Sequence, residues 1–230
     1  REQLKATADV IKIMATGGVM TPGVEPGAAQ LTYEEMAAAI SEAVKAGKKT
    51  ATHAQGTTGI RNAVLAGISS VEHGFYLTEE ICALMRERGT FLVATLAAPH
   101  WIIEKGEAAG IPAWAVDKAR RSSEAHIESF RLAIREGVPI AMGTDAGTPF
   151  NVHGNNAFEL ELMVRYGMTT SDALASATTR AAELLGLTDV GKIAIGMAAD
   201  MLLVEGNPVD DIRLFQSSIR TVVKNGTIIT

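Results

Sequence analysis

Short apolar runs alternate with longer amphipathic runs along most of the chain. The apolar runs fall at 10–15 (VIKIMA), 50–53, 70–73, 90–96 (TFLVATL) and 139–143 (PIAMG). VIKIMA, TFLVATL and PIAMG are almost continuously apolar, which is typical of strands buried on both faces of a parallel sheet. The pattern therefore predicts an α/β fold with five parallel strands, joined by helices in right-handed βαβ units.

The runs between these strands carry helix boundary signals. The helix expected over 31–46 begins with a capping box of Thr32 and Glu35 and ends before a glycine. Further helices are expected at 60–66, 78–88, 113–136 (as one helix or two), 156–166, 171–177 and 181–185. After Gly191 the pattern changes to strands at 200–205 and 219–224, with an Asn225-Gly226 turn after the second. The chain thus divides into an α/β part and a C-terminal strand part.

The composition is that of a globular protein, with 47% hydrophobic and 20% charged residues among 230. A net charge of −5 gives no basic face for nucleic acid, and no apolar run reaches membrane-spanning length. The single Cys82 excludes an internal disulfide and a thiolate-rich metal site. We expect no nucleic-acid or membrane partner, and a cytoplasmic location unless a signal precedes Arg1.

Side chains that can carry chemistry stand in or just after four of the predicted strands: Lys12, His53, His73 and Asp145. A parallel sheet can be doubly wound or part of a (β/α)₈ barrel, and in both the functional site lies at the carboxyl ends of the strands. Burial of Lys12 inside its apolar run would lower the pKa of its amine. A neutral amine can add carbon dioxide to form a carbamate that bridges two metals. With two histidines and an aspartate, this set suits zinc or a similar divalent ion.

Each of these residues also has a purely structural interpretation. Lys12 could extend to solvent or pair with a buried carboxylate. His53 and His73 could be hydrogen-bonded core histidines, and Asp145 could be a turn residue or a helix cap. The placement of all four at different strand ends favours the functional interpretation.

The other three histidines are weaker candidates. His100 lies in a Pro-His-Trp segment expected to be a loop, and His126 lies mid-helix, where we expect it at the surface. His153 follows Asp145 in a polar loop, where a solvated residue and a substrate contact both remain open. We retain His153 as a candidate substrate contact.

At the four strand-end residues the sequence resembles the amidohydrolase superfamily of (β/α)₈ metallohydrolases. It is most similar to imidazolonepropionase-like members that act as Xaa-Pro dipeptidases (prolidases) and metallo-carboxypeptidases. The matching stretches are IKIMATGGVMTPG, ATHAQGTTGI, SVEHGFYL and MGTDAGTPFNVHGNNAFELELMV, with GKIAIGMAADMLLVEGNP and VVKNG in the tail. The resemblance implies a partial (β/α)₈ TIM barrel, strands four to eight, over 1–190. Over 191–230 it implies the C-terminal strands of a composite β-subdomain.

The resemblance also implies roles. Lys12 matches a carboxylated lysine that bridges two metals, and His53 and His73 match the histidines of the fifth and sixth strands. Asp145 matches an eighth-strand aspartate that is both a metal ligand and a proton shuttle. The implied cofactor is a divalent metal, zinc, binuclear in the complete enzyme. The implied reaction is cleavage of the C–N amide bond of a dipeptide or N-acyl amino acid by metal-activated hydroxide. We also expect a homo-oligomer.

One family feature is absent from this sequence, the His-x-His pair of the first barrel strand. We therefore expect the chain to begin inside the domain and to bind at most one metal well, through Lys12, His53 and His73. Without strands from another chain, we expect poor stability and little activity.

Three alternatives remain. One is a non-catalytic fragment or relative, and another is a deaminase or cyclic-amide hydrolase of the same superfamily, which Lys12 argues against. The last is a doubly wound nucleotide binder, which is weak because ATGGVMTPG is not a phosphate-binding fingerprint.

Overall fold

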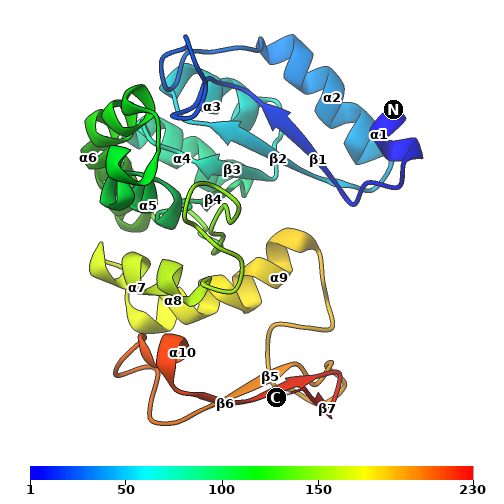
Figure 1. Cartoon of the computed structure of the whole chain (residues 1–230). Helices are drawn as coiled ribbons and strands as arrows, with labels where there is room; N and C mark the ends of the chain where they lie inside the picture. The colour runs from blue at the N-terminus through cyan, green and yellow to red at the C-terminus, as the bar shows by residue number, and fades with distance from the viewer. Residues whose placement is uncertain (230) are drawn as a thin grey trace.

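The computed structural model describes residues 1–229 and contains two β-sheets (Figure 1). The first sheet is parallel, with its strands in the order β1 (Val10–Met14), β2 (Lys49–Ala54), β3 (Ser70–His73) and β4 (Phe91–Val93). The expected fifth strand is a single parallel bridge between Leu92 and Ile140. Pro139 in this segment has no N–H to donate, and β4 is only three residues long. The predicted α/β class with a parallel sheet is confirmed, with this one difference.

Three helices follow the strands in turn and pack beside them: α2 (Tyr33–Lys45), α3 (Thr57–Leu65) and α4 (Glu79–Arg88). The capping box predicted for α2 is present, with the Glu35 carboxylate accepting a hydrogen bond from Thr32 N at 2.8 Å. Apolar residues of the sheet and of these helices, among them Ile13, Ile40 and Val71, form one buried core. The helices therefore bury one face of the sheet and leave its carboxyl-terminal edge to the loops.

Burial of the first strand on both faces was predicted and is wrong. Lys12 and Met14 are exposed in β1, whereas Ile13 between them is buried. The reason is that β1 is an edge strand, paired only with β2 and covered on one face. Lys12 is therefore accessible to solvent, and the expectation that it is buried inside its apolar run is wrong.

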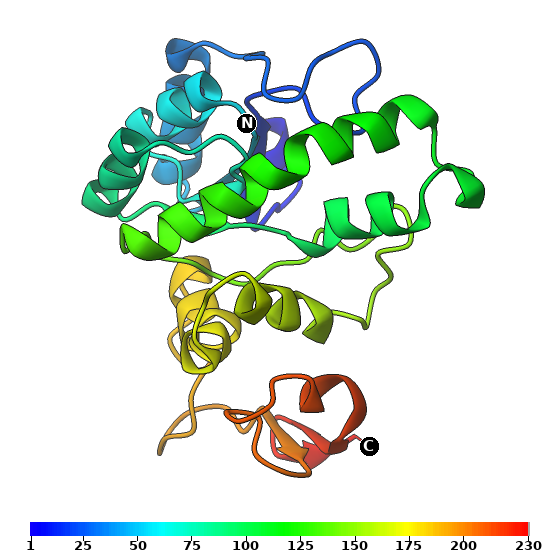
Figure 2. The ribbon, with the colours of Figure 1, turned by 90° about the vertical axis from the view of Figure 1, so that its left-hand side faces the viewer.

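The segment after β4 forms α5 (Ala97–Lys105) and a short 3₁₀ turn (Glu107–Ala109), followed by α6 (Ala113–Arg135), one long helix that crosses the side of the molecule (Figure 2). The expectation of a loop around His100 is wrong, because His100 lies within α5. The N-terminus of α5 is capped by the Glu159 carboxyl group, which accepts hydrogen bonds from Leu96 N at 2.7 Å and Ala97 N at 2.8 Å. This cap comes from a distant part of the chain, so local sequence signals do not reveal it.

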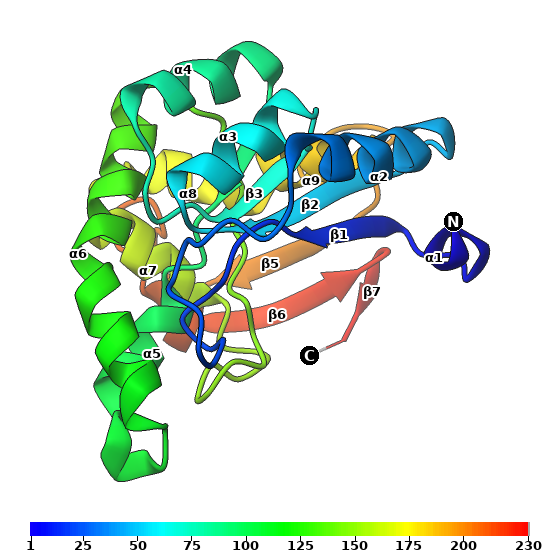
Figure 3. The ribbon, with the colours of Figure 1, turned by 90° about the horizontal axis from the view of Figure 1, so that it is seen from above.

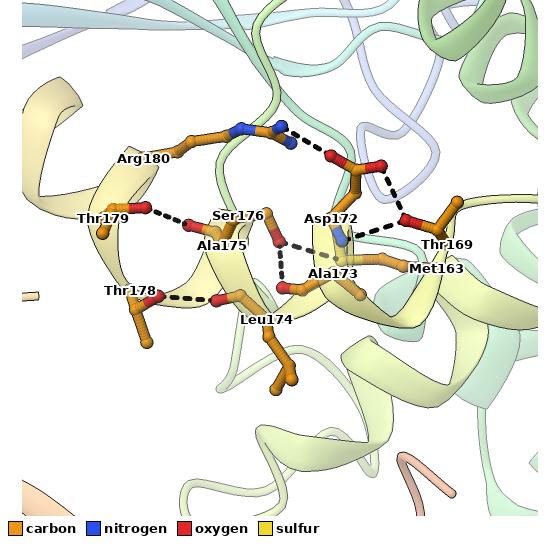
Figure 4. Close-up of polar contacts among 10 residues, drawn as sticks. All are labelled: Met163, Thr169, Asp172, Ala173, Leu174, Ala175, Ser176, Thr178, Thr179 and Arg180. Carbon is orange, nitrogen blue, oxygen red and sulfur yellow. Dashed lines mark hydrogen bonds and ion pairs between the residues drawn. The ribbon is translucent and has the colours of Figure 1, made fainter. Parts of the chain in front are cut away.

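Three shorter helices follow, namely α7 (Ala157–Arg165), α8 (Thr170–Ala177) and α9 (Thr179–Leu185). Figure 4 shows that Asp172 joins the last two, since it accepts hydrogen bonds from Thr169 Oγ1 and Arg180 Nη2, both at 2.6 Å. The carbonyl of Ser176 accepts a hydrogen bond from Met142 N at 3.0 Å. This contact ties the helical pair to the segment that leads to Asp145.

The C-terminal strands form a separate antiparallel sheet, in the order β5 (Met201–Val204), β6 (Ile219–Lys224) and β7 (Thr227–Ile228). The predicted turn at Asn225-Gly226 is confirmed, with left-handed φ values of 48° and 76°. Two one-turn helices, α1 (Glu2–Lys5) and α10 (Leu214–Ser217), complete the chain (Figure 1). Figure 3 shows α1 beside the start of β1. Among the described residues, no helix combines the length and apolar character needed to cross a membrane.

Candidate active site

The carboxyl ends of β1, β2 and β3 and the loop after Ile140 border one cavity of about 350 Å³. Lys12, His53, His73 and Asp145 all line it, so the structure brings the four strand-end residues together. His153 is not among the lining residues and is exposed in the loop after Asp145. The cavity is therefore the candidate site, with His153 outside it.

The two histidines stand at the ends of neighbouring strands, with ring centroids 4.6 Å apart. Within residues 1–229, His53 Nε2 is one of three buried side-chain atoms without a hydrogen-bond partner, and Gln55 Oε1, at the same cavity, is another. Gly18 lies against the His53 ring so closely that a Cβ there would be 2.8 Å from Nε2. A buried polar atom without a partner is unfavourable unless a ligand supplies one.

Burial sets the charge of both imidazoles. It is the main cause that lowers the pKa of His53 and, more strongly, that of His73. The positive charge of Lys12 lowers both pKa values further. Both rings are therefore neutral at neutral pH, which is the form that binds a metal ion.

The backbone is strained at three positions around the site: at the end of β3, just after β4 and in the loop after Ile140. His73, Thr95 and Asp145 have left-handed φ values of 74°, 53° and 56°. This region is uncommon for any residue other than glycine and is least favourable for a β-branched one such as threonine. Such strain concentrates at functional sites, where it aims side chains in directions that relaxed backbone does not allow.

The loop that carries Asp145 is closed by its own hydrogen bonds. Thr148 Oγ1 donates to the Asp145 carbonyl at 3.0 Å, and the buried Asn151 side chain donates to Thr144 O at 2.6 Å. The Asp145 side chain itself is exposed and borders the cavity. The loop thus places a solvent-accessible carboxylate at the same cavity as the two histidines.

Part of the cavity wall is apolar and comes from the loops after β1 and β3 and from α5. Val19, Phe75 and Ile102 belong to one buried apolar cluster, and all three line the cavity. The buried Lys118 of α6 donates from Nζ to Thr21 O at 2.8 Å and also to the carbonyl of Val24. This contact holds the β1 loop over the site, and sequence reasoning did not identify Lys118.

His126 is buried, with 2% of its surface exposed, so its predicted place at the surface is wrong. Its Nε2 lies 2.9 Å from Ala94 O, and its ring stacks on Phe75 with centroids 4.0 Å apart. The residues buried with it in α6, Ser122 and Ser129, recur at helical spacing. That spacing is the sequence signal that could have placed His126 on the inner face.

Acid is expected to destabilise the protein through His126. Burial lowers the pKa of His126 to about 4, below the ordinary value of 6.5. Between pH 6.5 and 4 the unfolded chain therefore gains a proton at this site that the folded chain does not. Stability should fall by about 3 kcal/mol over this range. Urea unfolding at pH 7.5, 5.5 and 4 measures this fall in the free energy of unfolding. In the His126→Gln variant, the fall between pH 7.5 and 4 should be smaller by about 3 kcal/mol. The same fall in both proteins contradicts the prediction.

Two buried or half-buried carboxyls near the site were also missed. Glu72 pairs in register with His53 across β2 and β3 and accepts a hydrogen bond from Ser70 Oγ at 2.5 Å. Burial raises its pKa, and the charge of Lys12 opposes this. Burial raises the pKa of Glu159, the α5 cap, to about 8. Strand alternation could have identified Glu72, but nothing local to the sequence identifies Glu159.

The donor set fits a divalent metal through its histidines. Two neutral imidazoles, one with an unpartnered buried Nε2, are ligands that zinc prefers. Within the described residues, no group of three or more His, Cys, Asp or Glu side chains could hold one ion. Lys12 and Asp145 line the same cavity as the two histidines.

Comparison with known proteins finds relatives that match nearly the whole of this chain. The sequence profile described as the amidohydrolase family matches residues 1–229. Ochratoxinase of Aspergillus niger is 36% identical over 236 residues. A crystal structure of a Xaa-Pro dipeptidase with bound methionine in its active site superimposes with a TM-score of 0.92 at 38% identity. A prolidase complexed with N-methylphosphonate-L-proline gives a TM-score of 0.92 at 30% identity.

The similarity covers nearly all of this chain but only part of each relative. The match includes 99% of this chain and 48% of ochratoxinase. For the dipeptidase and the prolidase, it includes 99% and 100% of this chain and 56% and 57% of theirs. The chain therefore spans about half the length of the proteins that it matches.

Proposed function

Because the chain belongs to the amidohydrolase family, we propose that it serves to hydrolyse a carbon–nitrogen amide bond with a divalent metal ion. The observation that carries the proposal is the histidine pair at the cavity. The ring centroids of His53 and His73 lie 4.6 Å apart, and His53 Nε2 is buried without a hydrogen-bond partner among the described residues. Lys12 and Asp145 line the same cavity.

We further propose that the four parallel strands and the segment at 139–143 correspond to strands four to eight of a (β/α)₈ barrel. Their order along the sheet follows their order in the chain, as in such a barrel. Residues 1–190 would form the barrel part, and residues 191–230 would contribute strands to a β-subdomain. Active sites of this fold lie at the carboxyl ends of the strands, where the cavity is found.

In the proposed site, His53 and His73 hold the metal, which we take to be zinc. When bound, such an ion activates a water molecule and polarises the carbonyl group of the substrate. Lys12 would join the ligands after its amine adds carbon dioxide and loses a proton to give a carbamate. A second ion is proposed for the complete enzyme, with Asp145 among its ligands.

Asp145 is the proposed proton carrier. Its carboxylate would accept a proton from the attacking water and later deliver it to the leaving nitrogen, as general base and then general acid. Its exposure and its place at the cavity support this role, since the proton must reach both water and substrate.

The proposed substrates are dipeptides or N-acyl amino acids. The apolar wall of Val19, Phe75 and Ile102 suits an apolar side chain or acyl group beside the polar residues of the cavity. The similarity to a prolidase and to ochratoxinase supports an amide substrate. His153 is left without a role, and the homo-oligomer stays a prediction.

Hydrolysis assays on Xaa-Pro dipeptides and N-acyl amino acids test the proposal. The chain is freed of metal with a chelator, assayed for release of the free amino acid, and assayed again after addition of zinc. We expect turnover, slow in this chain, that falls to background after chelation and returns with zinc. Equal rates with and without metal contradict the proposed chemistry, and zinc binding without any turnover supports a non-catalytic relative instead.

A further inference from the structure

The hydroxyl of Thr95, just after β4, lies between two groups of the site. Thr95 Oγ1 is 2.7 Å from the carbonyl oxygen of Ala94 and 2.7 Å from His73 Nδ1, and the residue is 3% exposed. Two oxygen atoms at 2.7 Å need a hydrogen between them, and a carbonyl has none to give. The single hydroxyl hydrogen of Thr95 therefore points to Ala94 O.

The direction of the second contact follows from the first. With its hydrogen already donated, the Thr95 oxygen can only accept, so His73 Nδ1 must carry the ring proton. In a neutral imidazole the other nitrogen, Nε2, then keeps its lone pair. We propose that Thr95 is a positioning residue that fixes His73 in the Nδ1–H tautomer and reserves Nε2 for a metal ion. The proposal rests on the proposed function, in which His73 is a metal ligand.

The backbone of Thr95 gives independent support. Its φ of 53° lies in the left-handed region, where glycine or asparagine fits with less strain. A β-branched residue is poorly suited to this conformation, so packing alone does not explain threonine here. The hydrogen-bonded hydroxyl does explain it, because neither glycine nor an aliphatic side chain can accept from His73.

The Ala94 carbonyl is itself held from the other side. His126 Nε2 lies 2.9 Å from this oxygen and must be the donor, so the carbonyl accepts from both His126 and Thr95. The His126 ring stacks on Phe75, which meets the His73 ring edge-on at 6.5 Å. The helix α6 thereby fixes the peptide that aligns Thr95, and Thr95 aligns His73.

Nitrogen NMR of the imidazoles tests the tautomer directly. The full chain, labelled with ¹⁵N-histidine and free of metal, is compared with its Thr95→Val and Thr95→Ser variants. We expect His73 to be protonated at Nδ1 in the unaltered chain and in Thr95→Ser. In Thr95→Val we expect a mixture of tautomers or Nε2–H. An Nε2–H tautomer in the unaltered chain overturns the proposal without any variant.

Zinc affinity gives the second measurement. Loss of such an orienting partner weakens metal binding by about 10–100-fold, so we expect this loss in Thr95→Val and its rescue in Thr95→Ser. Circular dichroism verifies that each variant is folded. Equal zinc affinity in folded Thr95→Val and the unaltered chain overturns the proposal. If the unaltered chain binds no zinc, the proposed function fails, whereas the NMR result still decides the role of Thr95.

Discussion

The Asp145→Asn variant is expected to hydrolyse amide substrates about 10²–10⁴-fold more slowly than the unaltered chain. The amide of asparagine nearly matches the carboxylate in shape but cannot take up the proton of the attacking water. The loop around Asp145 is held through the Asp145 carbonyl and the Thr144 carbonyl, so the substitution leaves those contacts in place. The quantity to measure is kcat for the best dipeptide or N-acyl amino acid.

The matched control is Asp117→Asn, which changes an exposed aspartate on α6 that pairs with the exposed Arg121. It should leave kcat unchanged. Zinc binding at the histidine pair should persist in Asp145→Asn, because that pair does not need the Asp145 carboxylate to stay in place. A kcat in Asp145→Asn equal to that of the control contradicts the role of proton carrier.

The Lys12→Ala variant is expected to hydrolyse substrate about 100-fold or more slowly than the unaltered chain, because one ligand of the proposed metal is removed. Added formate, acetate or propionate should restore part of the rate. A short carboxylate can enter the cavity beside His53 and His73 and take the place of the carbamate, since the side chain of Lys12 that filled this position is gone. The measurement is the rate as a function of carboxylate concentration.

Lys49→Ala serves as the control, since Lys49 is an exposed lysine at the start of β2, the opposite end of the sheet from the site. It should keep its rate and show no response to carboxylates. If Lys12→Ala keeps its full rate, or responds to carboxylates no more than the control does, the carbamate role is wrong.

Elements whose signals are local in the sequence were predictable. The helix α2 begins at its capping box, and the turn between β6 and β7 is made by Asn225 and Gly226. The helix α5 was not predictable, because its cap is the carboxyl group of Glu159, which the fold brings from a distant part of the chain. The exposure of Lys12 likewise depends on which strands flank β1, a property of the whole sheet.

The candidate site could likewise be predicted only in part from the sequence. Parallel strands end at one edge of the sheet, so Lys12, His53, His73 and Asp145 could be expected to meet at one place. The residues that orient them are set by tertiary contacts. Thr95 is an unremarkable residue in an apolar run until its left-handed backbone and its contact with His73 are seen.

Isothermal titration with zinc, on the unaltered chain and on a His53→Ala/His73→Ala double variant, tests the central claim that this histidine pair binds a divalent metal. The unaltered chain should bind a single zinc ion and unfold at a higher temperature with zinc than without it. The double variant should remain folded by circular dichroism and show neither effect. Zinc binding of equal affinity in the double variant, or no binding by the folded unaltered chain, contradicts the claim.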